Sequence, residues 1–246
     1  MVNNTKIRLR TRFKHFLFKL RKDILNGRLN LITYSKFIKL KKINNTPVKS
    51  LREYYKENNI KIIEGNSTQS NLQEKYLTTY KDNFNNVLEI GFNAGHSSEL
   101  FLCSNPNSNV LSIDLGYWYY CKFGYEFLKK KYPNRINVIF KDSIDALNDY
   151  ETIKENTFFD FIYIDGNHTY DYAYQDMINC KKFAKEDTII ILDDVVKDDN
   201  FRTLSNTAPT KVWNELAKEG FIIELDTAHF QDINRGVAVC KYNFDY

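Results

Sequence analysis

The 246 residues, 43% hydrophobic and 15% aromatic, can bury a full core, which excludes a disordered chain and predicts one large domain or one domain with an appendage. We expect a cytoplasmic protein, because no run approaches the roughly 20 apolar residues of a membrane span, no signal-peptide pattern follows the basic N-terminus, and four dispersed cysteines indicate neither a disulfide framework nor a zinc site. The net charge of +4 hides an asymmetry, since residues 1–42 hold 13 Lys and Arg against one acid and the remainder is acidic.

The N-terminal part is predicted to be helical. The stretch "KIRLRTRFKHFLFKLRKDIL", residues 6–25, places apolar residues at helical spacing and basic residues on the other face. We expect its apolar face to pack on the main domain or on a second subunit, giving a homo-oligomer, with an anionic membrane surface or nucleic acid as alternatives. A second helix is expected over residues 51–58, so residues 1–60 form a basic helical appendage and residues 61–246 the main domain.

A helix over residues 72–80 comes next, where Ser70 and Gln73 have the spacing of a capping box. After residue 82, short apolar runs alternate with amphipathic stretches of about 10 to 15 residues. The runs end at Ile90, Asp114, Phe140, Asp165 and Leu192, and helices are expected near residues 97–103, 117–131, 144–154 and 170–184. This alternation predicts a parallel sheet covered by helices.

The tail departs from that alternation. A helix near residues 211–219 precedes the runs "FIIELD" and "GVAVCKY", whose short connection requires antiparallel pairing at one edge of the sheet. The predicted fold class is therefore α/β, a Rossmann-like doubly wound sheet of seven mostly parallel strands with an antiparallel edge strand, plus N-terminal helices. The long polar stretch over residues 196–210 is expected to be a loop that serves as a lid.

In open α/β sheets, ligands bind beyond the carboxyl ends of the strands. The first strand ends in "LEIGFNAGHSS", where Glu89 precedes Gly91 and Gly95 in a turn that lets the backbone approach a bound group closely. A dinucleotide fingerprint would need glycine in place of Asn93 and His96, so a nicotinamide cofactor is disfavoured.

The next two strand ends indicate an adenosine-containing ligand. Asp114 ends the second strand and is placed to accept from two ribose hydroxyls. Asp142, with Ser143 beside it, follows the third strand and is placed to accept from an adenine amino group. Each of these acids alone is also a good helix cap, but together along one sheet they reinforce each other.

The stretches "VLEIGFNAGHSS", "LSID", "FKDS" and "FDFIYIDGNHTY" occur in that order over roughly residues 64–242. In this the chain resembles the class I S-adenosylmethionine-dependent methyltransferases, especially the small-molecule O-methyltransferases of the catechol and macrolide-sugar type. The resemblance implies S-adenosylmethionine as cofactor, with its methionine part at the turn and its ribose and adenine at the next two acids. The residues so assigned are Glu89, Gly91, Asn93, Gly95, Asp114, Asp142 and Ser143, and Asn93 departs from the glycine common at its position.

Three acids are expected at the next two strand ends. Asp165 ends the fourth strand, and Asp193 and Asp194 end the fifth. Clustered carboxylates repel one another unless a cation joins them, and oxygen ligands suit Mg²⁺ or Mn²⁺ rather than zinc. The catechol-type enzymes have a similar set of acids, whose metal holds the substrate hydroxyls. These acids are therefore predicted metal ligands, with the start of a simple loop as the alternative.

His168 follows three residues after Asp165, where the catechol-type enzymes place a basic lysine. An imidazole with a pKa near 6.5 can accept a proton from a hydroxyl at neutral pH, so His168 with Asp165 is the predicted catalytic pair. A capping or loop role for His168 is the alternative. His96 and His229 are expected to be structural.

We therefore predict an S-adenosylmethionine-dependent O-methyltransferase acting on a small hydroxylated acceptor, a sugar or nucleotide-sugar before a catechol. One alternative is an RNA ribose methyltransferase, suggested by the basic N-terminus, although nucleic acid is disfavoured as a partner. The turn "DGNH" also differs from the "NPPY"-like turn of base N-methylation. The other alternative is a non-catalytic partner protein that binds the adenosyl cofactor.

Overall fold

The computed structural model describes residues 50–63, 70–149, 153 and 157–246. The chain divides into two units, residues 1–47 and 48–246, and the fold described below is that of the second unit. The basic helix predicted over residues 6–25, and with it the predicted oligomer contact, lies outside the described residues. Each helix in the described ranges is too short or too polar to cross a bilayer.

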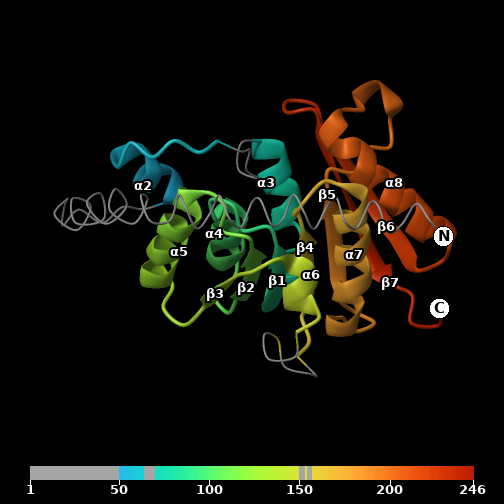
Figure 1. The fold of residues 1–246 in the computed structure, drawn as a ribbon, viewed down its shortest axis with the longest axis horizontal. Helices are drawn as coiled ribbons and strands as arrows, with labels where there is room; N and C mark the ends of the chain where they lie inside the picture. Colours follow the sequence, from blue (N-terminus) through green and yellow to red (C-terminus); the bar gives the residue numbers. More distant parts are fainter. Residues whose placement is uncertain (1–49, 64–69, 150–152, 154–156) are drawn as a thin grey trace, which may run out of the picture. The chain divides into compact units, whose positions relative to one another are not determined.

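The sheet has seven strands in the order β3-β2-β1-β4-β5-β7-β6 (Figure 1). The first five are parallel, and β7 is antiparallel to both β5 and β6. Their bounds are Asn86–Ile90 (β1), Asn109–Asp114 (β2), Ile136–Phe140 (β3), Phe161–Ile164 (β4), Ile189–Asp193 (β5), Ile222–Phe230 (β6) and Arg235–Tyr242 (β7). The predicted fold class is confirmed, and the order reverses between β1 and β4, where ligands bind in such sheets.

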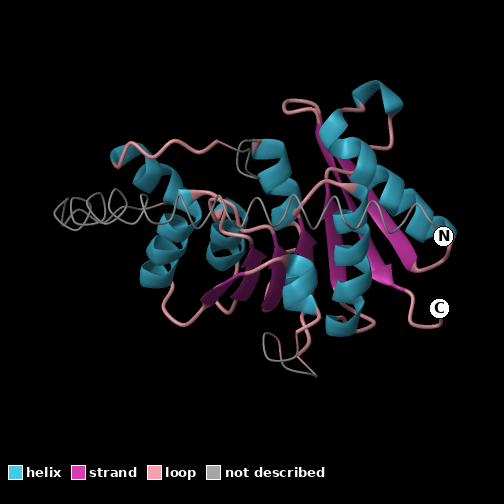
Figure 2. Cartoon of the chain, viewed as in Figure 1, coloured by secondary structure: helices cyan, strands magenta, loops and turns pink. Residues whose placement is uncertain are grey.

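Helices cover both faces of the sheet (Figure 2). On one face lie α2 (Leu51–Glu57), α3 (Asn71–Thr78), α4 (His96–Ser104) and α5 (Tyr119–Lys131), and on the other α6 (Ser143–Leu147), α7 (Tyr170–Cys180) and α8 (Leu204–Lys218). Short 3₁₀ turns are formed by Lys81–Asn83, Lys181–Phe183 and Asp199–Phe201. Helix α2 packs on α4 and α5, and the Tyr55 hydroxyl donates to the carbonyl oxygen of Ala94 at 2.7 Å.

The central strands are buried on both faces, so successive residues enter two different cores. One core lies under α6, α7 and α8 and includes Ile90, Ile164, Leu192, Met177 and Trp213. The other is aromatic: Phe84, Phe101, Phe161 and Tyr163 meet edge to face with ring centroids 4.7–5.6 Å apart. Because each strand contributes to both cores, its sequence reads as a continuous apolar run rather than an alternating one.

The start of α8 and the capping of α3 differ from the prediction. Helix α8 begins at Leu204, so the expectation of a loop throughout residues 196–210 is wrong in its second half. The reason is a capping box, in which the Thr203 and Asn206 side chains bond each other's backbone N–H groups and start the helix ahead of Pro209. At α3 the reciprocal half is missing, because Ser70 caps the helix but the Gln73 side chain turns toward Asp193.

Candidate active site

The turn between β1 and α4 has a backbone that few residues can adopt. Gly91, Asn93 and Gly95 have positive φ angles of 101°, 46° and 83°. A Cβ atom on Gly91 would lie 1.9 Å from the carbonyl oxygen of Asp165, so the end of β1 packs directly on the end of β4. Asparagine tolerates the left-handed conformation better than most residues, which explains how Asn93 replaces a glycine here.

Asp114, at the end of β2, is joined to this turn by backbone hydrogen bonds. Its Oδ2 accepts from the N–H of Asn93 at 2.8 Å and its Oδ1 from the N–H of Gly116 at 2.6 Å. Burial raises the pKa of this carboxyl, and the backbone N–H groups only partly offset that effect. The structure thus places Asp114 beside the glycine turn at one rim of the sheet.

Glu89 lies in β1, two residues before Gly91, and is fully buried on the side of the sheet that α4 covers. Its carboxylate accepts hydrogen bonds from the hydroxyls of Ser97, Ser98 and Ser112. Burial raises the pKa of Glu89 to about 7, against the lowering effect of the three serines. The carboxylate therefore ties the start of α4 to β2, and its direct contact with a cofactor stays a prediction.

Asp142 forms the N-cap of α6, with Ser143 as the first residue of that helix. Its Oδ1 accepts from the N–H of Ile144 at 3.0 Å, and the Tyr172 hydroxyl donates to its Oδ2 at 2.7 Å. Tyr172 comes from α7, and the sequence pattern had no signal that would assign it to this strand end. The tyrosine fixes the direction of a carboxylate predicted to read adenine.

On the predicted assignment of Asp114 to the ribose, replacing it with alanine should weaken binding of S-adenosylhomocysteine by about tenfold or more, because the predicted ribose contacts and the hydrogen bonds that order the turn are lost together. Isothermal titration calorimetry measures the change. Asp226→Ala is a matched control, since Asp226 lies on β6 and accepts from the Tyr76 hydroxyl. Equal affinity in the parent and Asp114→Ala would contradict the ribose assignment.

The ends of β4 and β5 bring a histidine between two carboxylates. His168 Nε2 lies 3.2 Å from Asp165 Oδ1, and His168 Nδ1 lies 3.1 Å from Asp194 Oδ2. Donor atoms of these three side chains all lie within 4.8 Å of one another. The two carboxylates can stabilise a proton on the imidazole. Alternatively, the three side chains can each offer one ligand atom to a cation.

The pKa of His168 is raised to about 9. Burial by itself lowers this pKa, but the hydrogen bond and charge of Asp165, together with the charge of Asp194, outweigh it. The imidazole therefore carries its second proton at neutral pH. It loses this proton, and can act as a base, only at a pH well above the reference pKa of 6.5.

Asp193 and Asp194 point to different partners although they are adjacent. Asp194 has a positive φ of 59°, which turns the chain between the two side chains. Asp193 accepts from the Tyr163 hydroxyl at 2.6 Å and from Gln73 Nε2 at 3.2 Å, and burial raises its pKa. Of the three predicted metal ligands, the structure brings Asp165 and Asp194 together with His168, while Asp193 contacts α3 and β4.

Arg235 is a further residue of this site that the sequence pattern did not predict. Its Nε and Nη2 donate to the two oxygens of Asp194 at 2.7 and 2.6 Å. Burial lowers its pKa, but the charges of Asp193, Asp194 and Asp165 raise it above its already high usual value. A signal existed, because the first residue of a strand antiparallel to β5 must lie beside the carboxyl end of β5.

Other predicted residues lie away from this group. His96 is buried against Tyr55, and burial lowers its pKa to about 4. His229 packs against Phe201 with ring centroids 4.2 Å apart. None of these contacts involves the carboxylates of β4 and β5.

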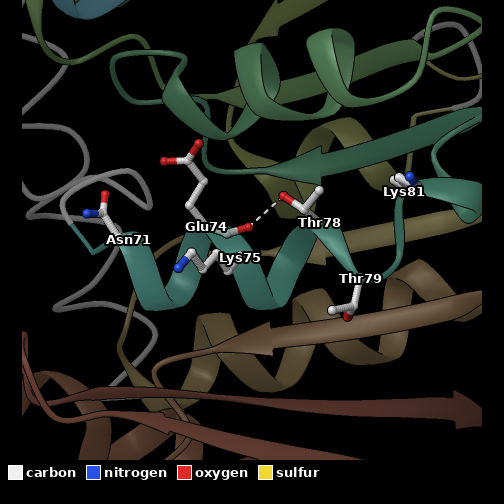
Figure 3. A pocket seen from close by; sticks show the side chains of 6 residues that line it. All are labelled: Asn71, Glu74, Lys75, Thr78, Thr79 and Lys81. Atoms are coloured by element: carbon white, nitrogen blue, oxygen red, sulfur yellow. Dashed lines mark hydrogen bonds between the residues drawn. The ribbon is translucent and has the colours of Figure 1, made fainter.

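Two hollows differ in position and size. A cavity of about 10 Å³, room for one water molecule, is lined by the turn from Asp165 to His168 and by Asp176 and Asp193. An open hollow of about 480 Å³ lies over the outer surface of α3, lined by Asn71, Glu74, Lys75, Thr78, Thr79 and Lys81 (Figure 3). The larger hollow contains none of the strand-end acids, so it is not the candidate site.

Comparison with known families finds one match. The family described as "Methyltransferase domain" matches residues 88–195, which run from β1 to just past β5. No curated protein matches the chain.

Solved structures share the fold at low sequence identity. An O-methyltransferase from Bacillus cereus in complex with S-adenosylhomocysteine is 18% identical over 80% of this chain and 93% of its own, with a TM-score of 0.59. A methyltransferase from Podospora anserina, bound to the same product, is 17% identical over 86% and 95%, with a TM-score of 0.60. The O-methyltransferase TomG from Streptomyces achromogenes is 14% identical over 80% and 92%, with a TM-score of 0.56.

Proposed function

We propose that the chain is a class I S-adenosylmethionine-dependent methyltransferase resembling the catechol-type O-methyltransferases, and that it methylates a hydroxyl of a small acceptor, a sugar or nucleotide-sugar before a catechol. The observation that carries the proposal is the contact of His168 Nε2 with Asp165 Oδ1 at the strand end that packs on the glycine turn. The contact supports His168, in its neutral form, as the proton acceptor beside the position proposed for the reactive end of the cofactor.

The residues of the first three strand ends fit an adenosyl cofactor. Gly91 leaves the turn without a side chain where the backbone of β4 comes close, and α4 begins directly after Gly95. We assign the methionine part to this turn, the ribose to Asp114 and the adenine to Asp142 with Ser143. Bound there, S-adenosylmethionine supplies the methyl group as an electrophile on a sulfonium.

His168 is assigned the role of general base. The hydroxyl oxygen of the acceptor forms the new bond to the methyl carbon, the carbon–sulfur bond breaks toward sulfur, and the hydroxyl proton passes to a ring nitrogen of His168. Asp165 orients the ring and stabilises the imidazolium that results. An aliphatic hydroxyl needs this help most, because its own pKa lies far above neutral.

The predicted Mg²⁺ or Mn²⁺ has Asp165, His168 and Asp194 as candidate ligands, with Asp193 one residue away. A cation held by these donors would lower the pKa of a bound hydroxyl. The same His168 nitrogen cannot bind a metal and accept a proton together, and Arg235 already contacts Asp194. The proposed steps therefore use His168 and Asp165 and require no cation.

The pH dependence follows from the raised pKa of His168, about 9. A base acts only in its neutral form, so kcat/KM should rise about tenfold per pH unit below pH 8 and level off above pH 9. Asp165→Asn removes the largest charge that raises this pKa, so its profile should level off at lower pH. A profile that is flat from pH 6 to 9 in the parent would contradict His168 as the base.

Methyl transfer itself is tested with radiolabelled S-adenosylmethionine and a panel of monosaccharides, nucleotide-sugars, catechols and RNA. Label that is recovered in a sugar with the parent chain, but not with His168→Gln, which lacks the proposed base, supports the proposal. Label recovered only in RNA favours ribose methylation. Stabilisation by S-adenosylhomocysteine with no transfer to any acceptor favours a non-catalytic partner protein.

A further inference from the structure

The guanidinium of Arg235 contacts the same two carboxylates that would hold a cation. Its Nη2 is 2.6 Å from Asp194 Oδ2 and 3.8 Å from Asp165 Oδ1. The two ring nitrogens of His168 contact these same two oxygens, at 3.1 and 3.2 Å. One positively charged group therefore already faces the oxygens that would ligate a metal.

Burial makes this contact difficult to exchange. The Asp194 side chain is 1% exposed and that of Arg235 is 23% exposed. A buried carboxylate requires a partner, and the forked guanidinium satisfies both of its oxygens at once. Arginine also keeps its charge at every accessible pH, so the pair does not open through loss of a proton.

Charge balance leads to the same result. The Arg235 guanidinium already offsets the charge of Asp194, at 2.6 Å, without any metal. A divalent cation among the same oxygens would lie within a few Å of the guanidinium, where like charges repel strongly at low dielectric. Metal binding therefore requires Arg235 to leave Asp194.

We propose that Arg235 is a positioning residue that serves as the permanent counter-cation of Asp165 and Asp194 and keeps divalent cations out of this donor set. The parent enzyme then works with His168 and Asp165 in the absence of added metal. The catalytic consequence of having Arg235 in place of a metal ion rests on the proposed function. The binding test below does not rest on it, because the test uses neither cofactor nor acceptor.

The test measures free Mn²⁺ by electron paramagnetic resonance with the parent chain, Arg235→Met, Arg235→Gln and Arg235→Lys. The parent and the charge-retaining lysine variant should bind Mn²⁺ weakly and alike. Arg235→Met should bind it at least about tenfold more tightly, because repulsion is removed and Asp194 gains a free ligand position. Mn²⁺ should also raise the melting temperature of Arg235→Met and leave that of the parent unchanged.

Two controls separate this effect from a general loss of charge or fold. Arg202→Met removes an arginine that pairs with exposed Asp199 and should bind Mn²⁺ as the parent does. Adding Asp194→Asn to Arg235→Met should abolish the gain. If Arg235→Met fails to fold, Arg235→Gln decides, because its amide still bonds Asp194 without a charge. Parent affinity equal to that of the uncharged variants overturns the proposal, whether or not methyl transfer is found.

Discussion

His168→Gln should lower the rate of methyl transfer about 10²- to 10⁴-fold while leaving the affinity for S-adenosylhomocysteine unchanged. Glutamine keeps an N–H donor at this position, but its amide cannot take a proton from the acceptor at any pH in the working range. Single-turnover rates with saturating cofactor, together with product titration by calorimetry, separate the chemical step from binding.

The control for this substitution is another histidine of the described chain. His229→Gln changes a ring that packs on Phe201 and contacts none of the strand-end acids, so its rate should stay close to that of the parent. If His168→Gln keeps most of the parent rate, the base is a different group. Loss of both rate and product binding would instead assign His168 to building the site.

Gly91→Ala should destabilise the fold by about 3 kcal/mol or more and abolish binding of the adenosyl product. The glycine has a φ of 101°, and an added methyl group would lie 1.9 Å from the carbonyl oxygen of Asp165. Relief of that clash requires the turn and the end of β4 to separate. For a chain of this length we expect a melting temperature lower by about 6–12 °C.

Gly220→Ala isolates the backbone part of this effect. Gly220 also has a positive φ, 76°, but an added methyl group would meet nothing within 4 Å. Its cost should be about 1 kcal/mol, that of a left-handed alanine alone. Equal melting temperatures for the two variants would show that the close approach of β1 to β4 has no energetic weight.

The fold was predictable because its signals are local. Buried parallel strands read as apolar runs, and the intervening helices show helical spacing, so the alternation through β5 could be recognised without any contact information. The strand ends followed from that reading, since the carboxyl ends of parallel strands share one rim. Asp114 and Asp165 were found in this way, and both lie at that rim.

The direction of a side chain was less predictable. Asp193 and Asp194 are adjacent in sequence, but the left-handed backbone at Asp194 sends one carboxylate to Tyr163 and the other to Arg235. Gln73 has the spacing of a capping residue, but its amide contacts Asp193. In each case a partner distant in sequence competed with the local pattern and won.

Local sequence patterns are enough to predict the α/β class, the glycine turn and the acids at the strand ends, because periodicity and strand-end position depend on neighbouring residues. Tertiary structure decided the chemistry of the last two strand ends. Only there do Arg235, from β7, and His168, from the turn after β4, meet the same two carboxylate oxygens. Charges brought together by folding set the pKa of His168 and the balance between a guanidinium and a metal, and such distances are not encoded in any local pattern.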